Sequence, residues 1–410
     1  MSAHKPITIV DARMGRGKSS AAIRYMNQQK GNRRFLYITP FLDEVGRICE
    51  RCDFDQADGD HMSKSSELKL HLRIGRNISA THSLFYLMDD EALELVRAKH
   101  YSLIVDESIQ VIERLNITDK DFELITSQLA DVKEDGSIHW KDDEYTGRFG
   151  DYKEMANTRS LFRLDSALLN ILNPNLLRSF DEVYMLTYLF NGQYQKAYLD
   201  YFGFDYKIVG VARDENGYFF TDKPDEPPPI DYRDLIHIVD SPKLVLVGDK
   251  NYSLSKSWYD RRRYGDPDIR ALRNGMKKFF QSIPGGNQET RLWTCYKGDV
   301  DKLVDSKTGR FRNNFLQSSA RATNEYRNRT DIAYMVNRFI DPNIMKFFNE
   351  QNITIDADDF ALSEMLQWIW RSAIRDGKPI NLYIPSKRMR ELLVNWIKNT
   401  NGGDSVARKV

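Results

Sequence analysis

Cysteine is scarce in this sequence, with three among 410 residues. So few thiols cannot form the disulfide framework of a small secreted domain, and their scarcity fits a reducing cytoplasm. Cys49 and Cys52 form a lone CxxC pair, whereas a structural zinc site needs two further ligands at suitable spacing. We therefore expect two incidental cysteines there and no zinc.

Long apolar runs and a net charge are missing as well. No stretch of 18 apolar residues occurs, and the opening MSAHKP has no apolar segment of a signal peptide, so we expect a cytoplasmic protein without membrane association. The 60 basic residues almost cancel the 59 acidic ones, giving a formal net charge of +1. A local basic stripe is enough to bind nucleic acid, so this balance neither supports nor excludes such a partner.

The chain is too long for one ordinary core, and its 41% apolar and 12% aromatic residues exclude wholesale disorder. The clearest linker is residues 222–230, where three consecutive prolines cannot join a helix or a central strand. We therefore predict a first domain over 1–225, a second over 226–400, and a flexible tail over 401–410.

Short apolar strands alternate with helical segments in both halves, as in parallel sheets that helices cover on both faces. The predicted strands are Ile7–Val10, Phe35–Thr39, Tyr101–Val105 and Val183–Thr187, then Leu292–Cys295, Ile332–Val336 and Ile380–Ile384. The stretch from about 110 to 178 is far longer than an ordinary connection, so we predict a mainly helical insertion there. The predicted fold class is α/β.

A glycine-containing turn from Ala12 to Ser19, with the sequence ARMGRGKS, separates the first predicted strand from a helix. Such loops hold nucleotide phosphates with backbone N–H groups at a helix N-terminus, while the lysine reaches the β and γ phosphates and the next hydroxyl ligates Mg²⁺. We therefore predict ATP and Mg²⁺ as cofactors. The predicted nucleotide-binding residues are Met14, Gly15, Arg16, Gly17, Lys18, Ser19 and Ser20.

Two adjacent acids, Asp106 and Glu107, follow the apolar strand Tyr101–Val105. Ligands gather at the carboxyl ends of parallel strands, so this is a suitable place for catalytic groups. In a P-loop enzyme the first acid holds Mg²⁺ and the second polarises the attacking water. We predict Lys18, Asp106 and Glu107 as catalytic residues, with Ser19 and Asp106 at the metal.

A third candidate group lies beyond the prolines, on a helix predicted over Ala361–Arg375. Gln367, Arg371 and Arg375 are spaced i, i+4, i+8, which would place one amide and two guanidinium groups on a single helical stripe. An arginine facing a γ-phosphate stabilises the charge that develops in the transition state. We predict these three residues as further catalytic residues, although a solvated polar face would have the same spacing.

Together these motifs resemble those of superfamily 2 helicases and translocases, whose two RecA-like lobes hold ATP. The matching segments are Ala12–Ser19 for motif I, Asp106–Glu107 for motif II, Thr187 for motif III, Ser319–Asn324 for motif V and Gln367–Arg375 for motif VI. Their spacing is most similar to bacteriophage-encoded DEAD-like helicases and viral origin-binding helicases. The resemblance implies nucleic-acid contacts from Thr39, Thr81, His82 and Thr323.

The sequence also departs from the pattern of that superfamily. Motif VI has Trp370 where a glycine normally precedes its first arginine, and Ile374 where its second arginine normally stands. No adenine-reading Gln motif is evident ahead of the phosphate loop. These departures leave open which arginine acts and what holds the base.

The predicted function is therefore an ATP-dependent helicase or translocase acting on DNA in phage replication or recombination, in the host cytoplasm. Nucleic acid is the expected partner, with replication proteins as further candidates and a monomer as the expected state. One alternative is a terminase-like DNA-packaging ATPase, although the acidic cluster of Asp356, Asp358 and Asp359 is better explained as a helix N-terminal turn. Another is a nucleic-acid-binding scaffold that ATP switches without motor activity.

Overall fold

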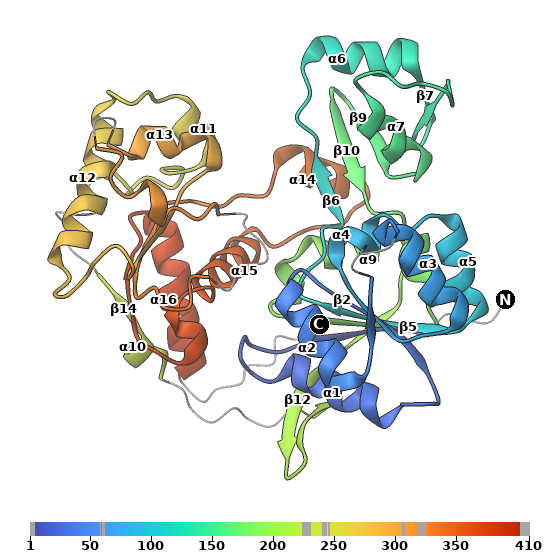
Figure 1. Ribbon diagram of the computed structural model, residues 1–410. Coiled ribbons are helices and arrows are strands. Elements are labelled where there is room, and N and C mark those ends of the chain that lie inside the picture. The colour runs from blue at the N-terminus through green and yellow to red at the C-terminus, as the bar shows by residue number, and fades with distance from the viewer. Residues whose placement is uncertain are drawn as a thin grey trace. The chain divides into compact units, whose positions relative to one another are not determined.

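A computed structural model describes residues 5–57, 59, 62–223, 231–239, 244, 247–305, 308–318 and 325–401 of the chain. Residues 224–230 of the proline-rich linker and residues 402–410 of the predicted tail lie outside these residues. The chain divides into two compact units (Figure 1). The first comprises Met1–Asp225 and Ile340–Ile355, and the second Glu226–Phe339 and Asp356–Val410.

The first unit contains an eight-stranded sheet in the order β13-β12-β1-β11-β5-β2-β4-β3. Its strands are β1 (Ile7–Asp11), β2 (Arg34–Thr39), β3 (Asp55–Gln56), β4 (Ile78–Thr81), β5 (Tyr101–Asp106), β11 (Glu182–Thr187), β12 (Tyr206–Asp214) and β13 (Gly217–Thr221). All neighbouring pairs are parallel except β12 and β13, which form an antiparallel hairpin at one edge. The predicted parallel α/β sheet is therefore confirmed.

Alternate residues of the central strands pack into two separate cores, which explains why the strands are apolar throughout. Ile9 belongs to one core and Val10 to the other, and Leu36 and Tyr37 divide in the same way. Helices α1 (Lys18–Gln28) and α2 (Leu42–Cys52) cover one face, and α5 (Asp90–Ala98) and α9 (Tyr194–Tyr201) cover the other. The cores hold the strand ends in a fixed row.

The insertion between β5 and β11 mixes helices and strands, whereas a mainly helical insertion was expected. Its strands are β6 (Ile112–Arg114), β7 (Ala130–Val132), β8 (Ile138–Trp140), β9 (Leu161–Leu164) and β10 (Ala167–Ile171). Its helical segments are α6 (Asp119–Leu124), a π-helical turn (Ile125–Leu129), α7 (Gly150–Asn157) and the short α8 (Asn175–Arg178). The overlooked signal is Asp135-Gly136, a dipeptide typical of tight hairpins, which joins β7 to β8 with Gly136 at φ 82°.

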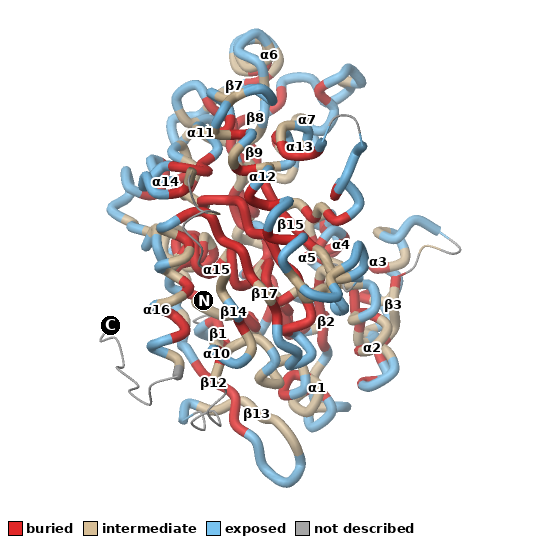
Figure 2. Tube along the Cα trace, turned by 90° about the vertical axis from the view of Figure 1, so that its left-hand side faces the viewer, coloured by how far each residue is buried: buried red, intermediate tan, exposed pale blue. Residues whose placement is uncertain are grey.

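The second unit is built on a parallel sheet in the order β14-β17-β16-β15. Its strands are β14 (Ile236–Ile238), β15 (Arg291–Thr294), β16 (Asp331–Tyr334) and β17 (Ile380–Tyr383), and its longest helices are α12 (Pro267–Ser282), α15 (Ala357–Ile369) and α16 (Lys387–Asn401). Figure 2 shows buried residues along β15 and β17. Among the described residues, no helix combines the length and the apolar character that crossing a bilayer requires.

One helix of the first unit comes from the far end of the sequence. α14 (Pro342–Asn349) lies within Ile340–Ile355, and its Ile344, Phe347 and Phe348 join the core that α5 and α9 cover. The Phe347 ring lies 4.9 Å from the ring of Tyr201 on α9. The chain therefore returns from the second unit to complete the first.

Candidate nucleotide site

The parallel strands of the first unit end in a row of polar residues. Asp11 pairs with Thr187 in register, Leu186 pairs with Asp106, and Thr39 pairs with Thr81. These residues end β1, β11, β5, β2 and β4, which are neighbours in the sheet. Because carboxyl ends of parallel strands meet at one edge, the fold brings motifs I and II together with Asp11 and three threonine side chains.

The phosphate loop joins the end of β1 to the start of α1. Gly15 and Gly17 have φ of 74° and 80°, a left-handed conformation that glycine adopts at no steric cost. Gly17 is the N-cap of α1, and neither a side-chain cap nor an acidic residue occupies the first turn. The first N–H groups of the helix are therefore available to an anion, as binding of nucleotide phosphates requires.

The side chain of Lys18 is hydrogen-bonded to backbone atoms of the phosphate loop. Its Nζ donates hydrogen bonds to the carbonyl oxygens of Ala12 at 2.5 Å and Arg13 at 3.1 Å. Burial lowers the pKa of Lys18, while the charges of Glu107, Asp106 and Asp11 oppose this shift. The ammonium thus has three carboxylates near it and two weak carbonyl acceptors that phosphate oxygens can replace.

Asp106 is buried at the end of β5 and contacts two hydroxyl groups. Ser19 Oγ donates to its Oδ2 at 3.2 Å, and the Tyr37 hydroxyl donates to the same oxygen at 2.7 Å. Burial raises the pKa of Asp106 to about 7, helped by the charges of Glu107 and Glu44 and opposed by the Tyr37 hydrogen bond and by Lys18. The predicted metal residues Ser19 and Asp106 therefore lie side by side, and a cation bound beside Asp106 would lower its pKa.

Glu107 follows Asp106 with a left-handed backbone, at φ 64°. A residue other than glycine rarely adopts this conformation, and such strain gathers at functional sites. His82 supports this turn, because its Nε2 donates a hydrogen bond to the carbonyl oxygen of Asp106 at 2.9 Å.

A hydrogen-bonded group links β5 to β11 beside the acids. Gln193 Oε1 accepts from Thr187 Oγ1 at 2.9 Å and from Ser108 Oγ at 3.1 Å, and Gln193 Nε2 donates to the carbonyl oxygen of Tyr188 at 2.8 Å. Thr187 and Gln193 are buried. Ser108, which follows the two acids, is therefore hydrogen-bonded through Gln193 to the end of β11.

Sequence reasoning missed three residues of this site: Tyr37, Gln193 and Asp11. Asp11 accepts hydrogen bonds from the backbone N–H groups of Leu189 at 3.0 Å and Phe190 at 3.2 Å, and burial raises its pKa. Tyr37 lies inside an apolar strand and Gln193 between two elements, so only the register of the sheet shows what they contact. Asp11 directly precedes the phosphate loop, and this position in the sequence could have identified it as a residue of the site.

The residues expected to contact nucleic acid are mostly covered. Thr39 is 0% exposed, and His82 is 6% exposed with its ring bound to Asp106. Thr81 is partly exposed, and its Oγ1 accepts from the Leu84 N–H at 3.3 Å as the N-cap of a short helix. Thr323 lies outside the described residues.

The predicted stripe of Gln367, Arg371 and Arg375 on one helix is wrong. α15 ends at Ile369, and Arg375 belongs to a separate 3₁₀ turn, Ala373–Asp376. The helix stops because Ser372 is extended (φ −87°, ψ −170°) and the Ala373 N–H donates to the carbonyl oxygen of Arg329 at 2.9 Å. Gln367 Nε2 donates to Ser363 Oγ at 3.2 Å, Arg371 is partly buried, and Arg375 is exposed.

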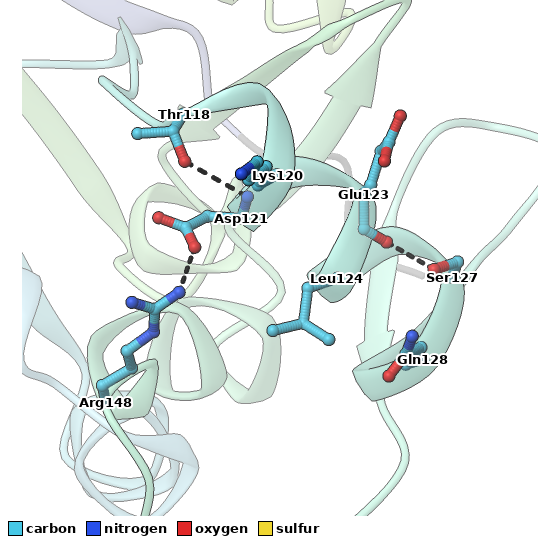
Figure 3. Close-up of a pocket in the computed structure, with 8 residues that line it drawn as sticks. All are labelled: Thr118, Lys120, Asp121, Glu123, Leu124, Ser127, Gln128 and Arg148. Atoms are coloured by element: carbon cyan, nitrogen blue, oxygen red, sulfur yellow. Dashed lines mark hydrogen bonds and ion pairs between the residues drawn. The ribbon is translucent and has the colours of Figure 1, made fainter.

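A pocket of about 600 Å³ lies away from these motifs, in the insertion. Figure 3 shows α6 and the following turn along one side, with the Asp121 and Arg148 side chains paired across it. None of the predicted site residues lines this pocket. It therefore adds no group to the candidate site.

The donor set suits Mg²⁺ and phosphate. Within the described ranges, no cluster of three or more histidine, cysteine, aspartate or glutamate side chains could hold a metal ion. One hydroxyl and one carboxylate, as at Ser19 and Asp106, are the few protein ligands that Mg²⁺ takes when phosphates and water complete its shell. The residues present therefore fit Mg²⁺–ATP.

Two family models match the chain. The model of the YonV C-terminal Rossmann-like domain matches residues 230–397, and that of the YonV middle domain matches residues 112–170, which lie in the insertion. A relative, the SPbeta prophage-derived uncharacterized protein YonV of Bacillus subtilis (strain 168), is 35% identical over 412 residues. The match covers 96% of this chain and 99% of that relative.

Solved structures with a similar fold include XPD. An apo XPD structure matches with a TM-score of 0.52 and 12% identity, covering 96% of this chain and 95% of that chain. An XPD helicase structure matches with a TM-score of 0.46 and 11% identity, covering 97% and 90%. The first match confirms a helicase-like fold with RecA-like lobes, and at this identity it shows the fold alone.

Proposed function

The chain belongs to the YonV family, and we propose that it is an ATP-dependent helicase or translocase of superfamily 2 that acts on DNA in phage replication or recombination. One observation carries this proposal: Ser19 at the start of α1 and Asp106 at the end of β5 lie 3.2 Å apart beside Lys18. A prophage-derived relative and the helicase-like fold support the setting.

Each residue of the site has a distinct task in this proposal. Bound Mg²⁺–ATP supplies the phosphoanhydride bond that is cleaved. Lys18 Nζ exchanges the carbonyls of Ala12 and Arg13 for phosphate oxygens, and the N–H groups of the loop bind others. Ser19 Oγ and the Asp106 carboxylate would hold the metal, which would supply positive charge beside the phosphates. Glu107 would accept a proton from the water that attacks the terminal phosphate, with ADP as the leaving group.

The link to nucleic acid is proposed through the ends of neighbouring strands. Thr81 is the partly exposed member of the residues expected to contact nucleic acid. Thr187 and Ser108 both donate to Gln193, so we expect the hydrolysis residues and the end of β11 to be coupled. Arg371 and Arg375 remain the candidates for stabilising charge on the transferred phosphoryl group, now as two separately positioned side chains.

A strand-displacement assay on tailed duplexes of both polarities and both sugar types tests the proposal. We expect ATP-dependent displacement or tracking on DNA, lost in Lys18→Ala. Hydrolysis without any displacement or translocation would favour the ATP-switched scaffold. Mg²⁺-dependent nicking of the duplex would favour a terminase-like packaging enzyme instead.

A further inference from the structure

The β12–β13 hairpin is fastened to the phosphate-loop helix. Strand β13 packs along α1, and Arg24 of α1 makes hydrogen bonds of 2.6 and 2.9 Å to the Asp214 carboxylate at the hairpin turn. The ring of Phe220 stacks on Tyr184, at 5.7 Å between centroids. These contacts fix the hairpin against the helix that follows the phosphate loop.

Tyr218 of this hairpin lies directly against Gly17. A Cβ atom placed on Gly17 would come within 2.4 Å of Tyr218 Cγ and 2.5 Å of both Cδ atoms, so one ring face rests on the glycine. The ring remains partly exposed. Arg213, its cross-strand neighbour, has its guanidinium carbon 5.4 Å from the ring centroid. An aromatic ring and a guanidinium group therefore border the loop on this side.

The order of the strands in the sheet indicates which end of a bound nucleotide would face the hairpin. Ser19 and Asp106 mark the metal and γ-phosphate end, and β5 lies on the β11 side of β1. β12 and β13 lie on the opposite side of β1. Because a nucleoside triphosphate is a linear chain, phosphates held at Lys18 and Ser19 direct the nucleoside away from Asp106, toward the hairpin.

We propose that the β12–β13 hairpin is the nucleoside-binding wall of the site, with the exposed part of the Tyr218 ring packing against the purine base and Arg213 positioning that ring. A tyrosine ring offers a flat apolar surface to a base, and a guanidinium group stabilises such a ring through its π face. The hairpin thereby performs the task for which no Gln motif is evident ahead of the loop. This inference rests on the proposed ATP-binding function.

Binding measurements with two probes test it: ATP, and inorganic tripolyphosphate, which has the phosphate chain and lacks the nucleoside. We expect Tyr218→Ala to weaken ATP binding about tenfold, a typical loss for an aromatic–base contact, while tripolyphosphate binding stays unchanged. Tyr218→Phe should retain ATP affinity because it keeps the ring. Phe219→Ala, which removes the neighbouring ring that lies against Arg24 and not against Gly17, is the matched control.

Equal losses for both probes would show that Tyr218 only shapes the loop, and no loss for ATP would also overturn the inference. Photolabelling of the wild-type protein with 8-azido-ATP needs no variant, and we expect the label on residues 206–221. A label confined to other peptides would contradict the proposal. The proposed function itself fails if the wild type binds neither probe. It also fails if Lys18→Ala binds ATP and tripolyphosphate as tightly as the wild type does.

Discussion

Asp106 is a buried carboxyl group, and its burial raises its pKa from the ordinary aspartate range to about 7. Between roughly pH 4 and 7, the folded protein therefore holds a proton that the unfolded chain has released. The contribution of Asp106 to the free energy of unfolding therefore falls as the pH rises through this window. Above pH 7 the buried charge destabilises the metal-free protein in full.

Asp106→Asn removes that charge while leaving an oxygen to accept from Ser19 and Tyr37. We expect the variant to be more stable than the wild type at pH 8 by on the order of 1 to 4 kcal/mol, and to differ little at pH 4.5. Thermal unfolding in EDTA at both pH values measures this. A stability difference that does not change with pH would contradict the account.

The two glycines of the phosphate loop offer a matched pair. Both have positive φ, but a Cβ on Gly17 meets the Tyr218 ring, whereas a Cβ on Gly15 meets nothing within 4 Å. Gly15→Ala should cost about 1 kcal/mol for its backbone conformation alone. Gly17→Ala should cost more and weaken ATP binding strongly, because the ring or the loop must move.

Denaturant unfolding and ATP titration of both variants measure the difference. Adding Tyr218→Ala to Gly17→Ala should recover part of the lost stability, because it removes the steric conflict. Equal effects of the two glycine substitutions would show that Tyr218 does not rest on the loop.

At the scale of elements, β5 and β11 are joined beside the acids by the Ser108, Thr187 and Gln193 side chains. Thr187→Val keeps the shape of the side chain and deletes the donor to Gln193. We expect ATP affinity to stay close to that of the wild type, with a several-fold smaller stimulation of ATPase by single-stranded DNA. Steady-state ATPase with and without DNA measures both, and undiminished stimulation would argue against coupling through this link.

The helices and strands also show which features of the fold a local sequence pattern can predict. Apolar strands ending in polar residues predict β1, β2, β5 and β11 and the phosphate loop, because each signal is local. α15 ends six residues before the predicted Arg375, because the turn is fixed by a hydrogen bond to the distant Arg329. The contacts of Tyr37, Gln193 and Tyr218 depend on strand register and hairpin packing, which no local pattern encodes.

At the scale of the whole molecule, the chain returns from the second unit so that α14 completes the core of the first. Phe348 is 1% exposed there, whereas Met345 on the same helix is 36% exposed. Phe348→Ala should destabilise the first unit by about 3 to 5 kcal/mol, as deletion of a buried aromatic ring does, and Met345→Ala should cost far less. Denaturant unfolding followed by hydrogen exchange in α5 and α9 measures this.

Protection of α5 and α9 that is unaffected by Phe348→Ala would show that α14 does not support the first unit. The sequence could not predict this return. Residues 340–355 lie more than a hundred positions beyond the proline-rich linker, and only the packed core shows which sheet they join.

Steady-state ATPase of the full chain tests whether the first unit hydrolyses ATP to act on DNA. We expect Mg²⁺-dependent hydrolysis that single-stranded DNA stimulates, reduced at least a hundredfold in Lys18→Ala and Glu107→Gln, on the order of losses seen for key catalytic groups. The Met345→Ala variant, at an exposed position of α14, should retain it. DNA-stimulated hydrolysis that persists in Lys18→Ala would contradict the account.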